Sequence, residues 1–256
     1  MDLTDEQWSI LEPLIPRHRR RADQRGRPWC DDRQVLNGIL WVLRTGAQWR
    51  DVPDRYPSPA TCHRRFQYWV RAGVFVRILA VLAEDLRDRG RLDLSEGLID
   101  GSFVIAKKGG SASGHSHRGK GSKLMAVADR SGLPIAVDVA GAARHDVTLV
   151  DTTLEARFLE EQPEHLIGDK AFDSDELAEH LAARGIELIA PHRARRRIPR
   201  QDGRSLRRYR RRWRVERLFA WLQNFRRLVV RYERDVLNFL GFVHLGCIVI
   251  LLRQYL

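Results

Sequence analysis

Apolar residues recur at helical spacing through the N-terminal third of the chain. A short amphipathic segment follows Thr4, a residue that favours helix caps, and it ends at Pro16. A second helix is predicted to begin at Asp31 or Asp32, to carry apolar side chains every three or four positions, and to end at Gly46. This part of the sequence therefore predicts an all-helical region.

A third helix is predicted to start at Ser58, because a serine cap is followed there by proline at the first helical position. Phe66 and Trp69 fall on its inner face, and Arg64 and Arg65 are expected to face outward near its start. A helix, a tight turn and a second helix with early basic residues are typical of helix-turn-helix DNA readers. A plain helical bundle with a solvated basic face would show the same pattern.

The pattern changes near residue 90, where short β-type runs separated by Gly- and Ser-rich stretches replace the helical spacing. The runs LSEGLIDGSFVIA, KLMAVAD and LPIAVDVA predict three strands, and HLIGD and IELIAP predict two more. Helices are expected over about 146–160, after the cap Ser174, and over about 204–225. This order predicts a mixed α/β sheet that opens with an antiparallel meander.

We therefore predict a helical domain over residues 1–92 and an α/β domain over 93–256. The apolar stretch FLGFVHLGCIVILL has about 14 residues, too few to span a bilayer, so we expect a buried helix. The N-terminus lacks the pattern of a signal peptide. Cys30, Cys62 and Cys247 lack metal-ligand spacing, which favours a reduced, cytoplasmic protein.

The net charge of +12 favours a polyanionic partner, and this charge is concentrated in one region. Residues 191–235 hold 17 arginines against four acidic residues, so that segment carries +13 and the rest of the chain about −1. A smaller basic run covers Arg17–Arg27. Localised positive charge is typical of nucleic-acid-binding proteins, although a GC-rich genome would also produce 40 arginines against five lysines.

Glu216 is the one acidic residue of the stretch YRRRWRVERLFAWLQNFRRL. A helical ion pair with Arg212, four residues earlier, is one explanation; the other is that Glu216 acts on a polyanion that the arginines hold. Asp100 and Asp169 each come where we expect a strand to end, the edge at which ligands bind in α/β sheets. Three carboxylates in a basic groove can hold two Mg²⁺ ions, which activate an attacking oxygen and stabilise the leaving oxygen at a phosphodiester.

Five stretches of the sequence show a family resemblance. IDGS, IGDKAFDSD and YRRRWRVERLFAWLQNFRRL resemble the three catalytic blocks of the DDE transposases of bacterial insertion sequences, and most of all those of the insertion-sequence-five family. LTDEQWSILEPLIP and VLNGILWVLRTGAQWRDVP resemble the helical DNA-binding domain of that family. The resemblance covers nearly the whole chain. It implies an RNase H-like fold in which Asp100, Asp169 and Glu216 are the catalytic residues and the ligands of two Mg²⁺ or Mn²⁺ ions.

The Tyr-Arg-Glu-Lys signature of the family maps onto Tyr209, Arg212 and the helical glutamate, whereas Gln223 stands at its final basic position. The resemblance implies that Tyr209 and Arg212 contact transposon-end DNA. Arg226 or Arg227, one turn further on, can take the place of the absent lysine.

The sequence thus predicts a bacterial transposase that is cytoplasmic and associated with the nucleoid. It is expected to bind double-stranded DNA at element ends, to cleave it, and to join the freed 3′-hydroxyl to target DNA as a homodimer or larger assembly. A plain nuclease or Holliday-junction resolvase would keep the same fold, and so would a transposase-derived DNA-binding protein without catalysis. The N-terminal helices argue against the former, and the three intact acids argue against the latter.

Overall fold

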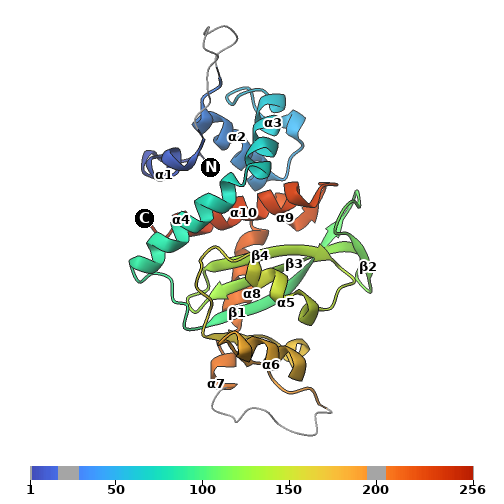
Figure 1. Ribbon diagram of the computed structural model, residues 1–256. Helices are drawn as coiled ribbons and strands as arrows, with labels where there is room; N and C mark the ends of the chain where they lie inside the picture. The colour runs from blue at the N-terminus through green and yellow to red at the C-terminus, as the bar shows by residue number, and fades with distance from the viewer. Residues whose placement is uncertain (1, 17–28, 195–205, 256) are drawn as a thin grey trace.

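The computed structural model describes residues 2–16, 29–194 and 206–255. The basic run Arg17–Arg27 and the arginines within 195–205 lie outside these ranges. Four helices lead the chain: α1 (Asp5–Leu11), α2 (Asp32–Thr45), α3 (Pro59–Arg71) and α4 (Val74–Asp88). Helices α1 to α3 gather at one end of the molecule, and α4 runs from there along the sheet domain (Figure 1).

Local sequence signals set the starts of the first three helices, as predicted, whereas α1 ends at Leu11 and not at the predicted Pro16. The side chains of Thr4, Asp31 and Ser58 each accept a hydrogen bond from a backbone N–H in the first turn of the helix that follows. Gly46 ends α2 with a φ of 71°, a left-handed conformation that favours glycine. Phe66 and Trp69 are fully buried, also as predicted.

A seven-stranded mixed sheet forms the centre of the second half. Its strands are β1 (Gly97–Ala106), β2 (Gly114–Ser116), β3 (Gly119–Asp129), β4 (Pro134–Gly141), β5 (His165–Ile167), β6 (Glu187–Ile189) and β7 (Val230–Arg231). β1, β3 and β4 form the predicted antiparallel meander, and β5 and β6 continue the sheet in parallel with β1. This order is that of an RNase H-like domain, and it confirms the predicted fold.

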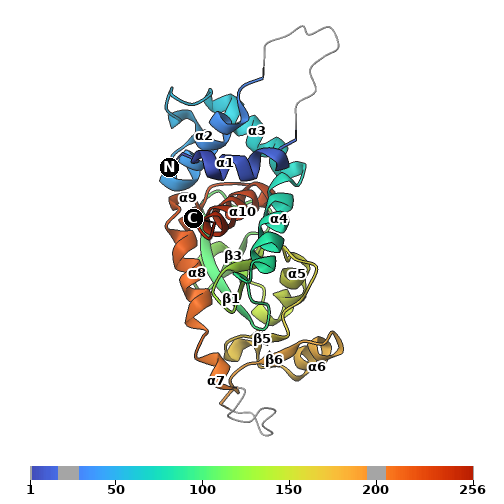
Figure 2. The same cartoon turned by 90° about the vertical axis from the view of Figure 1, so that its left-hand side faces the viewer.

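Helices cover both faces of this sheet. The remaining helices are α5 (Val150–Glu155), α6 (Asp175–Ala183), α7 (Leu206–Tyr209), α8 (Trp213–Gln223), α9 (Arg226–Val229) and α10 (Val236–Leu252). In Figure 2, α8 lies on one side of β1 and β3 and α5 lies on the other. The apolar C-terminal helix α10 is almost wholly buried, as predicted, and packs against α4, α3 and β4. One hydrophobic core therefore runs from the N-terminal helices into the sheet domain.

Three predicted elements differ from the structure. The helix expected over 146–160 is a 3₁₀ turn, η3 (Asp146–Leu149), followed by α5, which ends at Glu155. The helix expected over 204–225 is interrupted at 210–212, between α7 and α8. The Gly- and Ser-rich stretch before residue 123 is not wholly a loop, because β2 and the start of β3 pair there as a hairpin.

Among the described residues, no single helix is both long and apolar enough to cross a membrane. Helices α3 and α4 meet that test only when they are taken together, and they are bent by 65° at their junction.

Candidate active site

The sequence predicts Asp100 at the end of a strand, but it lies in the middle of β1. The strand continues to Ala106 because the antiparallel partner β3 pairs with it as far as Ile105. On its other edge β1 pairs with β5 at Gly97 and Leu98 and with β7 at Ile105 and Ala106. Asp100 therefore sits at a gap in the sheet between β5 and β7, where a ligand can approach the strand from its edge.

The parallel register brings Asp169 to the same place. Leu98 is paired with Ile167, so two further residues along each chain lead to Asp100 and to Asp169. Asp169 leaves the sheet just after β5 and begins the 3₁₀ turn η4 (Lys170–Phe172), and its Oδ1 accepts a hydrogen bond of 2.7 Å from the backbone N–H of Ala171. This bond fixes one carboxylate oxygen and leaves the other for a ligand.

Glu216 joins the site from α8 through an arginine. The guanidinium of Arg212 donates a hydrogen bond of 2.6 Å to Oδ2 of Asp100 and another of 2.8 Å to Oε1 of Glu216. Both explanations of Glu216 are thus compatible, because its ion-pair partner also binds the strand aspartate. The Glu216 side chain is 55% exposed, whereas those of Asp100 and Arg212 are largely buried.

The negative charges around Asp100 are not fully balanced by nearby positive charge. Burial raises the pKa of Asp100 above its ordinary value, and the negative charges of Asp169 and Asp146 add to this effect. Arg212 and a hydrogen bond from the backbone N–H of Gly101 act in the opposite direction, without cancelling it. A cluster of desolvated like charges of this kind is stabilised by a cation.

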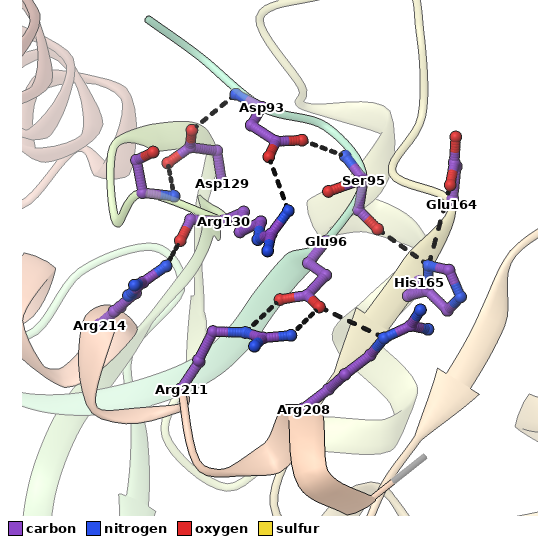
Figure 3. Close-up of polar contacts among 11 residues, drawn as sticks. Asp93, Ser95, Glu96, Asp129, Arg130, Glu164, His165, Arg208, Arg211 and Arg214 are labelled. Carbon is purple, nitrogen blue, oxygen red and sulfur yellow. Dashed lines mark hydrogen bonds and ion pairs between the residues drawn. The ribbon is translucent and has the colours of Figure 1, made fainter. Parts of the chain in front are cut away.

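Ion pairs with the sheet hold the arginine-rich segment in place (Figure 3). Glu96, directly before β1, is buried and accepts two hydrogen bonds from Arg211, one of them 2.7 Å long from Nε. Arg208 approaches the same carboxylate at 3.4 Å. Further along the segment, Arg214 and Arg217 donate hydrogen bonds to backbone carbonyls of residues 130 and 131, in the turn between β3 and β4. Much of the positive charge in this segment therefore anchors α8 to the sheet.

Two family models match the chain. A family model described as "Transposase DDE domain" matches residues 91–252, and one described as "Putative transposase of IS4/5 family" matches residues 3–79. The chain belongs to the DDE transposases of the IS4/5 family.

Two curated relatives come from insertion elements. This transposase is 38% identical over 139 residues to the "Putative transposase for insertion sequence element IS402" of Burkholderia cepacia, an alignment that spans 51% of this chain and 62% of that protein. It is 32% identical over 133 residues to the "Putative transposase for insertion sequence element IS6501" of Brucella ovis, spanning 51% of this chain and 98% of that one.

A solved structure shares the fold. The piggyBac transposase, in a synaptic complex with hairpin DNA, superposes with a TM-score of 0.55 over 97% of this chain and 72% of that chain. The identity is 11%, so the match supports the architecture alone.

The predicted DNA contacts of the transposase fall into two groups. Arg64 and Arg226 are exposed, and Tyr209 is half-buried against the core. Arg65 does not face outward as predicted: it is buried, ion-paired with Asp32 and close to the ring of Trp69. In this structure the Arg65 side chain is therefore almost absent from the accessible surface.

Arg227 is also buried, contrary to expectation. Its guanidinium pairs with Glu233 and donates to the carbonyl of Ala47 at 3.0 Å, so it joins α9 to the end of α2. Of the two arginines that follow Gln223, Arg226 is the exposed one, and Gln223 is itself exposed on α8.

The sequence does not predict that Lys123 and Asp146 lie close together. Lys123 on β3 lies with its Nζ 2.5 Å from Oδ1 of Asp146, and this pair packs beside Gly101, the neighbour of Asp100. A helix is expected from about residue 146, and Asp146 indeed begins the 3₁₀ turn η3. Nothing local connects it to a lysine 23 residues earlier.

The donor set fits a hard divalent cation. Asp100, Asp169 and Glu216 offer only carboxylate oxygens, the ligands that Mg²⁺ and Mn²⁺ accept. Within the described part of the chain, no three His, Cys, Asp or Glu side chains are gathered closely enough to hold an ion as they stand. The guanidinium of Arg212 instead bridges two of the three acids, which shows that this space attracts positive charge.

Proposed function

We propose that this transposase binds the ends of its insertion element and catalyses metal-dependent DNA cleavage and strand transfer, with Asp100, Asp169 and Glu216 as the metal ligands. One observation carries the proposal. Two of the three acids share a single cation, Arg212, and the strand register brings the third acid beside them. Three acids that only stabilised the fold would not need to lie around one largely buried guanidinium, whose charge interacts with all three.

Each residue has a distinct part in this mechanism. Asp100 and Asp169 come from paired strands and hold fixed positions, whereas Glu216 on α8 can adjust, since its side chain is more exposed. Bound Mg²⁺ would supply a Lewis acid that polarises the phosphodiester and lowers the pKa of the attacking hydroxyl or water. Arg212 holds Asp100 and Glu216 in register, and once DNA is bound its guanidinium can pair with a phosphate.

We expect nicking to require a divalent metal. Supercoiled plasmid that carries the gene with its flanking DNA should be nicked in Mg²⁺ or Mn²⁺ and left intact in excess chelator, because unpaired carboxylates repel phosphate. Gel electrophoresis measures both states on one preparation. Undiminished nicking in chelator would contradict the proposal.

The same reaction separates a transposase from a plain nuclease. A transposase should also join the cut ends to a second plasmid, giving products that contain both DNAs. Cleavage without joined products at any metal concentration would favour the nuclease. Metal-independent binding without any cleavage would favour a DNA-binding protein that has lost its chemistry.

The N-terminal helices are proposed to read the element ends through α3. Replacing the exposed Arg64 with alanine should weaken end binding by about fivefold or more, since a lost base contact costs about 1–3 kcal/mol. Binding to random duplex should fall less, because base contacts specify sequence and phosphate contacts do not. Gel shifts with both DNAs measure the difference, and equal losses would make Arg64 a phosphate anchor.

Arg65→Ala is the matched control for Arg64→Ala. It removes the same charge from the next residue but breaks a buried pair with Asp32, so it should lower the unfolding temperature. At a temperature where it remains folded, it should keep the preference for element ends.

We also propose that two or more copies act together on double-stranded DNA in the bacterial nucleoid. An insertion element has two ends, and joining both of them to one target requires an active site at each. The piggyBac complex named above is described as synaptic. Light scattering with and without end DNA would measure the assembly.

A further inference from the structure

A lysine and an aspartate form a pair behind the catalytic strand. Successive residues of a strand point to opposite faces, so Gly101 presents the face of β1 opposite to that of Asp100. A Cβ atom on Gly101 would lie 3.2 Å from Oδ1 of Asp146 and 3.4 Å from Cδ of Lys123. The pair therefore packs directly on the backbone next to the catalytic aspartate.

The ammonium group of Lys123 has N–H donor capacity that its neighbours do not use. An ammonium group has three N–H donors. The ammonium donates one hydrogen bond of 2.6 Å, to the carbonyl of Arg144, and forms an ion pair with Asp146, whose Oδ1 lies 2.5 Å from Nζ. No other acceptor for Nζ is found among the described residues, and the side chain is 18% exposed. The ammonium is thus held in place and can still bind an anion.

Two pockets meet at this lysine. One, of about 430 Å³, reaches Ala171 in the turn that Asp169 begins and ends near Arg193. The other, of about 420 Å³, reaches Gly101 and is lined by Arg118 and Arg144. Lys123 and Asp146 belong to the walls of both. Their lining also includes the carboxylates of Asp146 and Asp173. Cations spread over two adjoining hollows nevertheless suit an extended polyanion better than a single small anion.

We propose that Lys123 binds a backbone phosphate of the DNA on the face of β1 opposite to Arg212, and that Asp146 is a positioning residue that holds the ammonium there. This inference rests on the proposed function only for the identity of the polyanion as DNA. DNA would then be held from both faces of β1, with Arg212 on one and Lys123 on the other. The alternative is an ion pair that merely fixes η3 to β3.

The salt dependence of DNA binding distinguishes the two. Each phosphate contact adds about 0.9 to the slope of log K against log salt on duplex DNA. Lys123→Gln should reduce that slope by about 0.9 and lower affinity in low salt by about three- to tenfold, and Lys123→Arg should restore most of both. Fluorescence anisotropy with a labelled duplex in chelator measures the slope without any cleavage.

Lys107→Gln is the matched control. Lys107 is an exposed lysine just after β1 and lines neither pocket, so its loss should leave the slope unchanged. Asp146→Asn tests positioning. Removal of a negative charge normally strengthens DNA binding, so a reduced slope in this variant would mean that Lys123 depends on Asp146.

The inference is overturned if Lys123→Gln keeps the parental slope, or if Lys107→Gln loses as much. An unchanged or steeper slope in Asp146→Asn would overturn the positioning role. If Lys123→Gln unfolds because Asp146 is left unpaired, the double variant Lys123→Gln/Asp146→Asn removes both charges and is measured instead. Because this assay contains no metal, a transposase that fails to nick DNA can still pass it, so the two failures are distinguishable.

Discussion

Replacing Glu216 with glutamine should abolish nicking and strand transfer while leaving the protein folded and able to bind DNA. Glutamine keeps the size and helix propensity of the residue but removes the charge that a metal ligand needs. Metal ions contribute several kcal/mol of transition-state stabilisation. Because each ~1.4 kcal/mol is a factor of ten in rate, we expect a loss of at least about a thousandfold, measured by plasmid nicking.

Stability should hardly change in this variant. Glu216 is 55% exposed, and its partner Arg212 keeps a second carboxylate, Asp100, when the glutamate is replaced. Helical pairs spaced four residues apart contribute about 0.3–0.5 kcal/mol when exposed. DNA binding should survive or tighten, since one negative charge leaves a region that holds phosphate. Glu84→Gln, at an exposed position of α4, removes the same charge elsewhere and should nick at the parental rate.

Asp100→Asn and Asp169→Asn should behave like Glu216→Gln. Combining these substitutions should cost little more than any one of them, because residues that act as one catalytic unit are not additive. Near-parental nicking by Glu216→Gln would reduce this glutamate to a helical ion-pair partner. Loss of folding in the same variant would instead show that its bond to Arg212 stabilises the structure.

The starts of the first three helices and the end of α2 could be predicted because their causes are local. The caps at Thr4, Asp31 and Ser58 and the left-handed Gly46 each act within one turn of their own helix. The strand pattern of the sheet was likewise visible in short runs of β-type residues. Signals of this kind need no knowledge of distant parts of the chain.

Features that depend on distant partners could not be predicted in the same way. Arg65 shares a helical face with the buried Phe66 and Trp69, yet its inward position became clear only with Asp32, 33 residues earlier. The break between α7 and α8 carries no proline or glycine, and there Arg211 pairs with Glu96, 115 residues away. Helical periodicity alone predicts neither of these two ion pairs.

The candidate site is an intermediate case. Motif and order singled out Asp100, Asp169 and Glu216, but the way in which they meet depends on the register of β1 against β5 and on Arg212. Even the position of Asp100 within its strand was set by the length of β3. A sequence motif thus names the acids, and strand pairing determines the geometry that lets them share a cation.

Arg226 and Arg227 offer the clearest test of which arginines serve the fold and which serve DNA. The side chains of Arg227 and Glu233 are both 8% exposed, and the arginine also donates to a carbonyl at the end of α2. Removal of one partner of a buried pair typically costs about 3–5 kcal/mol, because the other charge stays buried and unpaired. Arg227→Ala should therefore lower the unfolding temperature by about 6–20 °C.

The neighbouring Arg226→Ala should show the reverse behaviour. Arg226 is exposed, so its loss should leave the unfolding temperature almost unchanged and weaken DNA binding. Differential scanning fluorimetry and anisotropy on both variants give the two readouts. If Arg227→Ala were as stable as the parent but bound DNA more weakly, the guanidinium would have to leave its pocket to reach phosphate. In that case the exchange of Glu233 for a phosphate, and not burial, would be its function.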